Sequence, residues 1–351
     1  FNKDIYQNMG EYKLFCMGNP LLDIQVNGDE SLLNKYGLEA NASILAEEKH
    51  KPLFEELVQD YTPAYVAGGA AQNAARGAQY LLPPQSTVYV GCVGNDQFAV
   101  KLRQAAEKDG LRVEYMVVND VPTGTCAAII TGQNRSLVAN LSAAEKYHVS
   151  DIKTPEKWKW VVNADYFYIG GFFLTVSVES ILEVAKYAAE HNKPFTLNIS
   201  AAFLCQFFKD QLDSVLPYCD ILFGNETEAE AYATNHNWDT KDIKQIALHI
   251  SKLPKVNSKR ERIVVITQGE NATLVAYSNG TVNEYPVTLI DKKDIVDTNG
   301  AGDAFVGGFL SQYVQDKTID ESVAAAHWLA RKSIQLVGPA YPEEKLTYPP
   351  L

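Results

Sequence analysis

Short apolar runs alternate with amphipathic stretches through most of this sequence. The apolar runs are rich in Val, Ile, Phe and Tyr, and they have the length of buried strands; they lie at residues 14–17, 88–90, 166–169, 195–199, 221–223 and 263–267. The stretches at 98–108, 178–190 and 243–252 carry apolar residues at helical spacing. Strands that alternate with helices predict an α/β fold, in which helices cover both faces of a mostly parallel sheet.

Two stretches depart from this alternation. Between residues 24 and 64, helix-like pieces surround a short segment at 44–46. Between 125 and 141, two strand-like runs flank a turn at 132–134, which is the composition of a β-hairpin. We interpret both as a small α/β lid inserted into a large domain. The expected large domain comprises residues 14–23, 65–117 and 142–351, and the expected lid comprises residues 24–64 and 118–141.

The glycine-rich run Asp297-Thr298-Asn299-Gly300-Ala301-Gly302-Asp303 gives the strongest chemical signal. We expect Ile295 and Val296 to end a strand before it, and residues 304–310 have helical spacing after it. The run would then be a strand-to-helix turn, and a helix N-terminus binds anions. Asp303 would add a carboxylate within the first helical turn. An anion site beside a base is what phosphoryl transfer to a hydroxyl requires.

Other interpretations of this turn compete. Acidic residues are common in the first turn of a helix simply because they complement the helix dipole. A dinucleotide fingerprint would need a third glycine where Phe305 stands. The sequence has no Gly-Lys pair, which excludes a G-x-x-x-x-G-K-[ST] phosphate loop.

The complete run resembles the C-terminal signature of the ribokinase-like family of carbohydrate and nucleoside kinases. Further segments are similar to the members of that family that phosphorylate adenosine: GNPLLD (18–23), AGG (67–69), QN (72–73), PTGTC (122–126), NRSL (134–137), GFFLT (171–175) and FGNETE (223–228). The resemblance extends from about Leu14 to the region of Pro342. It implies a three-layer α/β sandwich with an inserted lid. It also implies transfer of the γ-phosphoryl group of Mg·ATP to the 5′-hydroxyl of adenosine, a purine-salvage reaction that gives AMP and ADP.

The resemblance assigns roles to individual residues. Asp303 would be the general base, and the backbone from Asn299 through Gly300, Ala301 and Gly302 would stabilise the transferring phosphoryl group. The lid residue Arg135 would approach the phosphates when the lid closes. The ribose would be held by Asn19, Asp23, Gly68, Gly69 and Asn73, and the purine by Leu45, Cys126, Leu137, Ala139, Leu141, Phe172, Phe173 and Phe203.

The ATP side is less distinctive in the sequence. The resemblance implies contacts from Asn225, Thr267, Gly269, Asn299 and His327, with Asn225 and Glu228 near Mg²⁺ through water. Structural alternatives exist for several of these positions. Asn225 and Glu228 also have the spacing of a helix capping box. Gly68-Gly69 followed by Asn73 could simply turn and cap the chain, and phenylalanines in such runs are often core residues.

Composition limits the partners. A formal net charge of −12 argues against nucleic-acid binding, which needs a basic surface. No apolar run approaches the ~18 residues of a membrane span, and residues 1–13 do not resemble a secretory signal. Five cysteines without a Cys-x-x-Cys pair fit reduced thiols. We expect a cytoplasmic monomer that binds neither nucleic acid nor membranes. Whether part of the protein is nuclear stays open. Whether a K⁺ ion lies behind the 297–302 turn, as in some relatives, also stays open.

Two functional alternatives are also open. The first is a kinase of the same family that acts on another nucleoside or on a sugar, although an aromatic slot suits a purine better than a free sugar. The second is a catalytically inactive nucleoside-binding protein, against which the intact Asp303 and its glycines argue.

Overall fold

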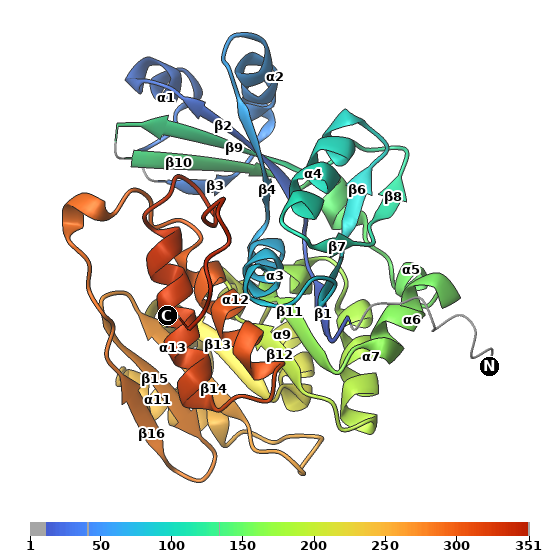
Figure 1. The fold of residues 1–351 in the computed structure, drawn as a ribbon, viewed down its shortest axis with the longest axis vertical. Coiled ribbons are helices and arrows are strands. Elements are labelled where there is room, and N and C mark those ends of the chain that lie inside the picture. The colour runs from blue at the N-terminus through green and yellow to red at the C-terminus, as the bar shows by residue number, and fades with distance from the viewer. Residues whose placement is uncertain (1–11, 41, 133, 350–351) are drawn as a thin grey trace.

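The computed structural model describes residues 12–40, 42–132 and 134–349. Its centre is a nine-stranded sheet (Figure 1). The strands lie in the order β16 (Val282–Tyr285), β15 (Asn271–Tyr277), β14 (Ile263–Gln268), β13 (Ile221–Asn225), β12 (Phe195–Asn198), β11 (Tyr166–Gly170), β1 (Leu14–Met17), β5 (Thr87–Val90) and β7 (Arg112–Val113). The pairs from β14 through β7 are parallel, whereas β15 pairs antiparallel with both of its neighbours.

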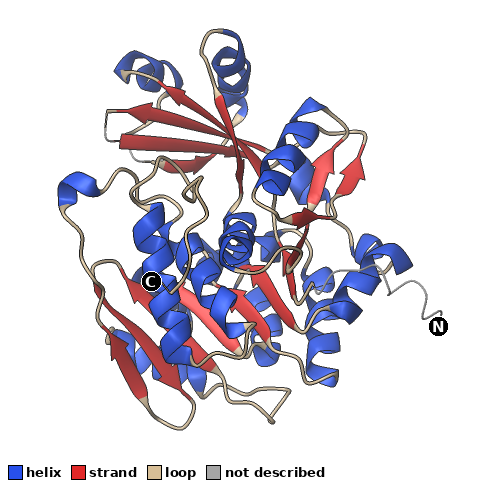
Figure 2. Ribbon diagram, in the orientation of Figure 1, coloured by secondary structure: helices blue, strands red, loops and turns tan. Residues whose placement is uncertain are grey.

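Helices cover both faces of this sheet (Figure 2). Successive side chains of a strand point to opposite faces, and β1 shows the consequence: Leu14 and Cys16 belong to one core cluster, Phe15 and Met17 to the other. The first cluster includes side chains of α3 (Ala70–Leu81), α4 (Gln97–Lys108), α12 (Ala301–Tyr313) and α13 (Ile319–Ser333). The second includes those of α5 (Val149–Ile152), α6 (Pro155–Asn163), α7 (Val178–Glu190), α8 (Ala202–Phe207), α9 (Lys209–Val215), α10 (Glu226–Asn235) and α11 (Ile243–Ser251).

A second, five-stranded sheet lies above the first in Figure 1. Its order is β3 (Ser43–Leu45), β10 (Asn134–Asn140), β9 (Thr125–Thr131), β2 (Leu21–Asn27) and β4 (Ala64–Gly68). One face packs on α1 (Glu30–Tyr36) and α2 (Lys51–Gln59), through a cluster that includes Ile24 of β2 and Val138 of β10. The residues on either side of Val138 belong to a different cluster, on the opposite face. A short third sheet pairs β6 (Cys92–Gly94) with β8 (Met116–Val118).

The predicted fold class is confirmed, and the six predicted strands of the central sheet all form. The predicted hairpin is the antiparallel pair of β9 and β10; Gln133 of its turn lies outside the described residues. The short segment expected at 44–46 overlaps β3. Among the described residues, no helix has the length and apolar character that crossing a membrane requires.

One prediction about the chain is wrong: Ile295 and Val296 do not end a strand. They follow a short 3₁₀ turn, η6 (Lys292–Asp294), and their exposed fractions are 36% and 46%. The N–H groups of Val296 and Asp297 donate to the carbonyl of Ile334, just beyond α13, at 2.8 and 3.2 Å. The backbone N–H groups of this segment therefore find their acceptor at the end of a helix and not in a neighbouring strand. β propensity alone did not produce a strand.

Candidate active site

The 297–303 run forms the entry into α12. Gly300 caps that helix with φ of 78°, a left-handed conformation that glycine adopts without strain. A Cβ at Gly300 would also lie 2.8 Å from Cβ of Pro339. Ahead of it, the N–H of Asn299 donates to Oδ1 of Asp297 at 2.8 Å, which closes the turn. Ala301 begins the helix, and Asp303 lies in its first turn. The N–H of Ala301 donates to the carbonyl of Thr298 at 3.2 Å, and the N–H groups of the first helical turn after it lie beside the Asp303 carboxylate.

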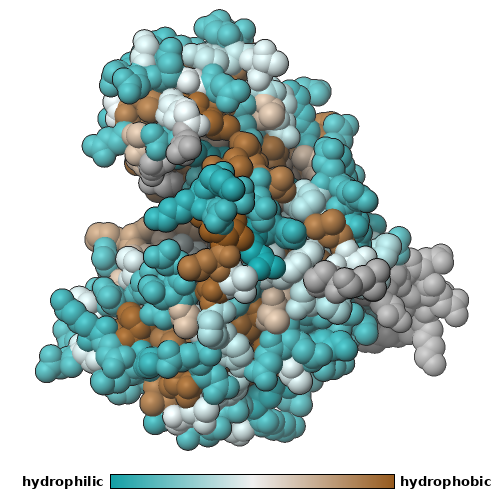
Figure 3. Space-filling model, turned by 60° about the vertical axis from the view of Figure 1, so that its left-hand side comes forward, coloured by the Kyte–Doolittle hydropathy of each residue, from teal (hydrophilic) through white to brown (hydrophobic). Residues whose placement is uncertain are grey.

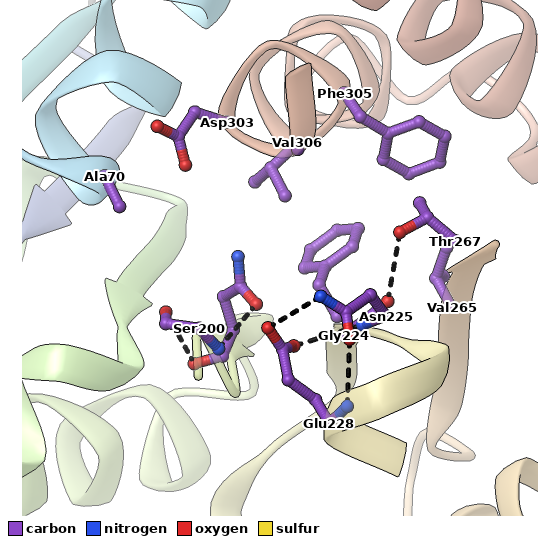
Figure 4. A pocket seen from close by; sticks show the side chains of 13 residues that line it. Ala70, Ser200, Gly224, Asn225, Glu228, Val265, Thr267, Asp303, Phe305 and Val306 are labelled. Atoms are coloured by element: carbon purple, nitrogen blue, oxygen red, sulfur yellow. Dashed lines mark hydrogen bonds between the residues drawn. The ribbon is translucent and has the colours of Figure 1, made fainter. Parts of the chain in front are cut away.

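A polar cavity of about 190 Å³ opens beside Asp303 (Figure 4). Its walls come from the start of α12, the carboxyl ends of β12, β13 and β14, and the first residue of α3. A Cβ on Gly302, which lines it, would meet no atom within 4 Å. The predicted site residues that line it are Asn225, Glu228, Thr267, Gly302 and Asp303.

A larger cavity of about 350 Å³ lies next to it and is mostly apolar. The five-stranded sheet supplies one wall, and the residues after β11 and β12 supply the other. Ala70 lines both cavities, so they meet at the start of α3. On the face drawn in Figure 3, the surface is hollowed between the smaller upper part of the molecule and the larger lower part. The predicted site residues that line the apolar cavity are Asn19, Leu45, Gly69, Ala139, Leu141, Phe172, Phe173 and Phe203.

Asp303 is held by a residue from a distant part of the sequence. Nδ2 of Asn73, in the first turn of α3, donates to Oδ2 of Asp303 at 2.9 Å. Burial raises the pKa of Asp303 to about 7; the hydrogen bond from Asn73 opposes this rise, and the charges of Asp23 and Glu228 add to it. The alternative that Asn73 merely caps its helix is wrong, because Gly69 is the N-cap and no side chain caps α3.

Asp23 lies on β2 and is 6% exposed. A Cβ on Gly68 would collide with its carboxylate, so the lack of a side chain there lets β4 approach Asp23 closely. Burial raises the pKa of Asp23 to about 6, against the positive charges of Arg135 and Arg76. Nη2 of Arg135 lies 3.6 Å from Oδ2 of Asp23, and its Nη1 lies 2.9 Å from Oδ2 of Asp297. Arg135 is thus buried between the five-stranded sheet and the 297–303 turn.

Asn225 and Glu228 form a complete capping box at the start of α10 (Figure 4). Oδ1 of Asn225 accepts from the N–H of Glu228 at 2.8 Å. The two Glu228 oxygens accept from the backbone N–H and from Nδ2 of Asn225, both at 3.1 Å. Burial raises the pKa of Glu228 to about 7. The two residues cap a helix and also line the polar cavity, so the structural and functional interpretations are compatible.

Eleven predicted site residues line neither cavity: Asp23, Gly68, Asn73, Arg135, Asn299, Gly300 and Ala301, described above, and Cys126, Leu137, Gly269 and His327. Cys126 is 6% exposed and packs with Leu137 behind Ala139 and Leu141. His327 bonds to Oγ1 of Thr273 at 2.8 Å and packs behind Phe305. Gly269 has φ of 57° in the turn between β14 and β15, and a Cβ there would meet no atom within 4 Å.

All five cysteines are free and buried, which fits the expected reduced thiols.

Several wall residues were missed by sequence reasoning. In the polar cavity these include Asn198, the last residue of β12, Ser200 just after it, and Phe305 and Val306 of α12. Oδ1 of Asn198 accepts from the Ser200 N–H at 3.0 Å, and Ser200 Oγ accepts from the Gly171 N–H at 2.9 Å. Asn198 had a usable signal, because it is a polar residue at the carboxyl end of a predicted strand, where open α/β sheets bind ligands.

Comparisons with known proteins agree with this geometry. Residues 31–346 match the pfkB family of carbohydrate kinases. An adenosine kinase from Schizosaccharomyces pombe is 48% identical over 343 residues, covering 97% of this chain and 99% of that protein. A crystal structure of Anopheles gambiae adenosine kinase with P1,P4-di(adenosine-5) tetraphosphate superposes with a TM-score of 0.87 at 45% identity, covering 94% of this chain and 98% of that one.

A structure of Schistosoma mansoni adenosine kinase with adenosine and AMP gives a TM-score of 0.86 at 35% identity, over 95% of this chain and 98% of that one. The family match spans most of the sequence, and these relatives align along nearly their whole lengths. The resemblance found in the sequence motifs is therefore confirmed, and the chain belongs to the pfkB family of carbohydrate kinases.

Proposed function

We propose that this chain transfers the γ-phosphoryl group of ATP to the 5′-hydroxyl of adenosine, giving AMP and ADP, as a step of purine salvage. One observation carries the proposal: an apolar cavity walled by Phe172, Phe173 and Phe203 meets a polar cavity at Ala70, and Asp303 lies at the polar one. An aromatic wall suits a purine, since stacking geometry adds roughly 0.5–1.5 kcal/mol to area burial. The names of the relatives, and the adenosine in the Schistosoma mansoni complex, support the same substrate.

The arrangement suits an in-line transfer. The nucleoside 5′-hydroxyl would lie where the cavities meet, within reach of the Asp303 carboxylate. Asp303 takes the hydroxyl proton, the hydroxyl oxygen bonds to the γ-phosphorus, and the bond from that phosphorus to the bridging oxygen breaks to release ADP. The N–H groups of the first turn of α12, from Gly302 onward, would face the charge on the transferring group. The N–H groups of Asn299 and Ala301 already donate to Oδ1 of Asp297 and to the carbonyl of Thr298. Asp23, close to Gly68, would accept hydrogen bonds from the ribose hydroxyls.

The donor set fits a magnesium ion that is held chiefly by nucleotide phosphates and water. No cluster of three or more acidic, histidine or cysteine side chains that could bind a metal occurs within 12–40, 42–132 and 134–349. Both oxygens of Glu228 are already hydrogen-bonded to Asn225, so a contact to Mg²⁺ would pass through water. Mg²⁺, when bound, neutralises phosphate charge during the transfer. The K⁺ ion behind the 297–302 turn stays a prediction.

The test compares acceptors in a steady-state assay with Mg·ATP. We expect adenosine to exceed guanosine, ribose and fructose in kcat/KM. The Asp303→Asn variant should lose about 10²–10⁴-fold in kcat while it still binds adenosine, because only the base is removed. Preference for a free sugar would support the sugar-kinase alternative, and binding without turnover in the wild type would support the inactive nucleoside-binding protein.

A further inference from the structure

Arg76 is a buried arginine on α3 to which the proposed mechanism gives no role. It is 4% exposed, its guanidinium donates to four groups, and it lies over the Tyr341 ring at 5.7 Å from the ring centroid. Nε lies 2.5 Å from Oδ2 of Asp109, at the end of α4. Nη1 donates to the carbonyl of Ala67 at 2.6 Å, to the carbonyl of Pro339 at 3.0 Å and to Oδ1 of Asn73 at 3.2 Å. Arg76 therefore links the end of β4 and the backbone behind Gly300 to the residue that holds Asp303.

The contact from Arg76 fixes the orientation of the Asn73 amide. A guanidinium can only donate hydrogen bonds, so it must face the amide oxygen. The NH₂ group of Asn73 then points at Asp303, whose carboxylate can only accept when it is ionised. A flipped amide would place NH₂ against the guanidinium and oxygen against the carboxylate, and both contacts would be repulsive. Tyr341 restrains the backbone of the same residue, because its hydroxyl donates to the Asn73 carbonyl at 2.8 Å.

We propose that Arg76 is a positioning residue for the reaction: through the amide of Asn73 it orients the Asp303 carboxylate and favours its ionised form. This inference rests on the proposed function, in which Asp303 is the base. The contacts form a chain in which Asp109 pairs with Arg76, Arg76 donates to Asn73, and Asn73 donates to Asp303. A hydrogen bond whose donor is itself polarised by a cation is stronger than an isolated amide contact.

The charges around Asp303 explain why such support is needed. The carboxylates of Asp23, on β2, and Glu228, on α10, both oppose its ionisation, as does its burial. Arg76 is the positive group that favours ionisation. Two buried phenols, Tyr168 on β11 and Tyr341, also interact electrostatically with Asp303, and burial keeps both protonated. Without Arg76, the positive charge that lowers the pKa of Asp303 would be lost, while burial and the charges of Asp23 and Glu228 would still raise it.

The experiment measures the ionisation of Asp303 directly, without substrates. Protein with ¹³C-labelled aspartate carboxyl groups is titrated by NMR, and the Asp303 signal is assigned by its loss in Asp303→Asn. Arg76→Met should raise the midpoint of Asp303 by about one pH unit, as expected for loss of a favourable neighbouring charge. Arg76→Lys, which keeps the charge but loses the planar fork, should give a smaller rise.

Asp109→Asn is the matched control. It removes the outer ion pair but leaves Arg76 charged beside Asn73, so the midpoint should stay unchanged or fall. If Arg76 served packing alone, Arg76→Met and Arg76→Lys would both lower the melting temperature without moving the titration midpoint of Asp303. Folding is checked by circular dichroism. If Arg76→Met does not fold, the comparison of Arg76→Lys with the wild type decides.

Turnover provides the second readout. At pH 7, Arg76→Met should lower kcat by about 10–100-fold. Because Arg76 is assigned no phosphate contact, the KM for ATP should change by less than about twofold. The variant should recover part of its activity at higher pH. A folded Arg76 variant with the wild-type midpoint and the wild-type kcat would overturn the proposal. The NMR midpoint does not depend on activity, so a wild-type chain that fails to phosphorylate adenosine would count against the proposed function alone.

Discussion

Nη1 of Arg135 lies 2.9 Å from Oδ2 of Asp297, which joins a strand of the five-stranded sheet to the turn before α12 across 162 residues of sequence. Arg135 is 6% exposed, so it is not a solvated surface arginine. The same Asp297 oxygen accepts from the Gly338 N–H at 2.9 Å. The ion pair holds the guanidinium beside the turn that we assign to the phosphates. For Arg135 to reach a phosphate oxygen, that oxygen must replace Asp297 or share the arginine with it.

Arg135→Ala should lower kcat more than it weakens adenosine binding, because the phosphate contact would form mainly in the closed ternary complex. It should also lower the melting temperature, since Asp297 loses its buried partner. Arg135→Lys should restore only part of kcat, because an ammonium cannot form the bidentate pair. The measurement is kcat at saturating ATP and adenosine, with calorimetry of adenosine binding.

The control for Arg135 is Lys35→Ala, which breaks an ion pair between Lys35 of α1 and Glu56 of α2. The Lys35 side chain is 58% exposed, so its loss should leave kcat unchanged and stability within about 1 kcal/mol. An unchanged kcat in Arg135→Ala would remove Arg135 from the mechanism.

Asp23→Ala should raise the KM for adenosine and leave the KM for ATP nearly unchanged, because the Asp23 carboxylate is assigned to the ribose hydroxyls. Loss of a charged acceptor should cost about 1.5–3 kcal/mol of binding. 2′-Deoxyadenosine should be the poorer substrate of the wild type and lose its disadvantage in the variant. If the ratio of kcat/KM for the two nucleosides is the same in both proteins, the ribose contact is assigned to the wrong residue.

Local patterns predicted the layers of this fold because the six predicted strands of the central sheet are mostly buried on both faces. The four residues of β1 are all apolar because both of its faces are buried, and they divide between the two core clusters. In β10 the alternation is also local. Leu137 and Ala139 flank Val138 in the sequence, and the cluster that contains them excludes Val138.

What the sequence could not supply are contacts between distant segments. Asn73 and Asp303 are 230 residues apart, and no spacing rule pairs them. Arg76 is one turn beyond Asn73 on α3, but its role depends on Asp109 and Pro339, which the fold brings together. The Ile295–Val296 error has the same origin, since the backbone partner of that segment is Ile334 and no strand lies beside it.

Glu228→Gln should raise the Mg²⁺ concentration needed for half-maximal activity by about tenfold, as expected for an outer-shell ligand. Glutamine keeps one oxygen that can accept from the Asn225 N–H, but its NH₂ group then replaces the oxygen that accepts from Nδ2 of Asn225. The melting temperature should therefore fall only slightly. Activity is measured against free Mg²⁺ at fixed Mg·ATP. Glu230→Gln, an exposed position on the same helix, is the control and should match the wild type. Equal Mg²⁺ dependence in both variants would exclude Glu228 from the metal site.

The raised pKa of Asp303 has opposite consequences for activity and for stability. A base must be ionised, so kcat/KM for the wild type should fall as pH drops below about 7, the pKa to which burial raises Asp303. Asp23 and Glu228 are buried nearby with pKa values of about 6 and about 7. The fall of kcat/KM at acid pH should therefore reflect all three carboxyl groups and be steeper than the titration of one group.

For stability, an aspartate in the unfolded chain titrates near ~3.9, whereas folded Asp303 holds its proton up to about pH 7. Between these values the folded state binds more protons, so this group makes unfolding easier as pH rises through the window, and the full cost is present above it. Asp303→Asn removes that cost, and the amide can still accept from Asn73. The variant should therefore melt at a higher temperature than the wild type at pH 8, with the difference shrinking toward pH 5. Calorimetry of both proteins at the two pH values measures it, and a variant that is less stable at pH 8 would contradict the raised pKa.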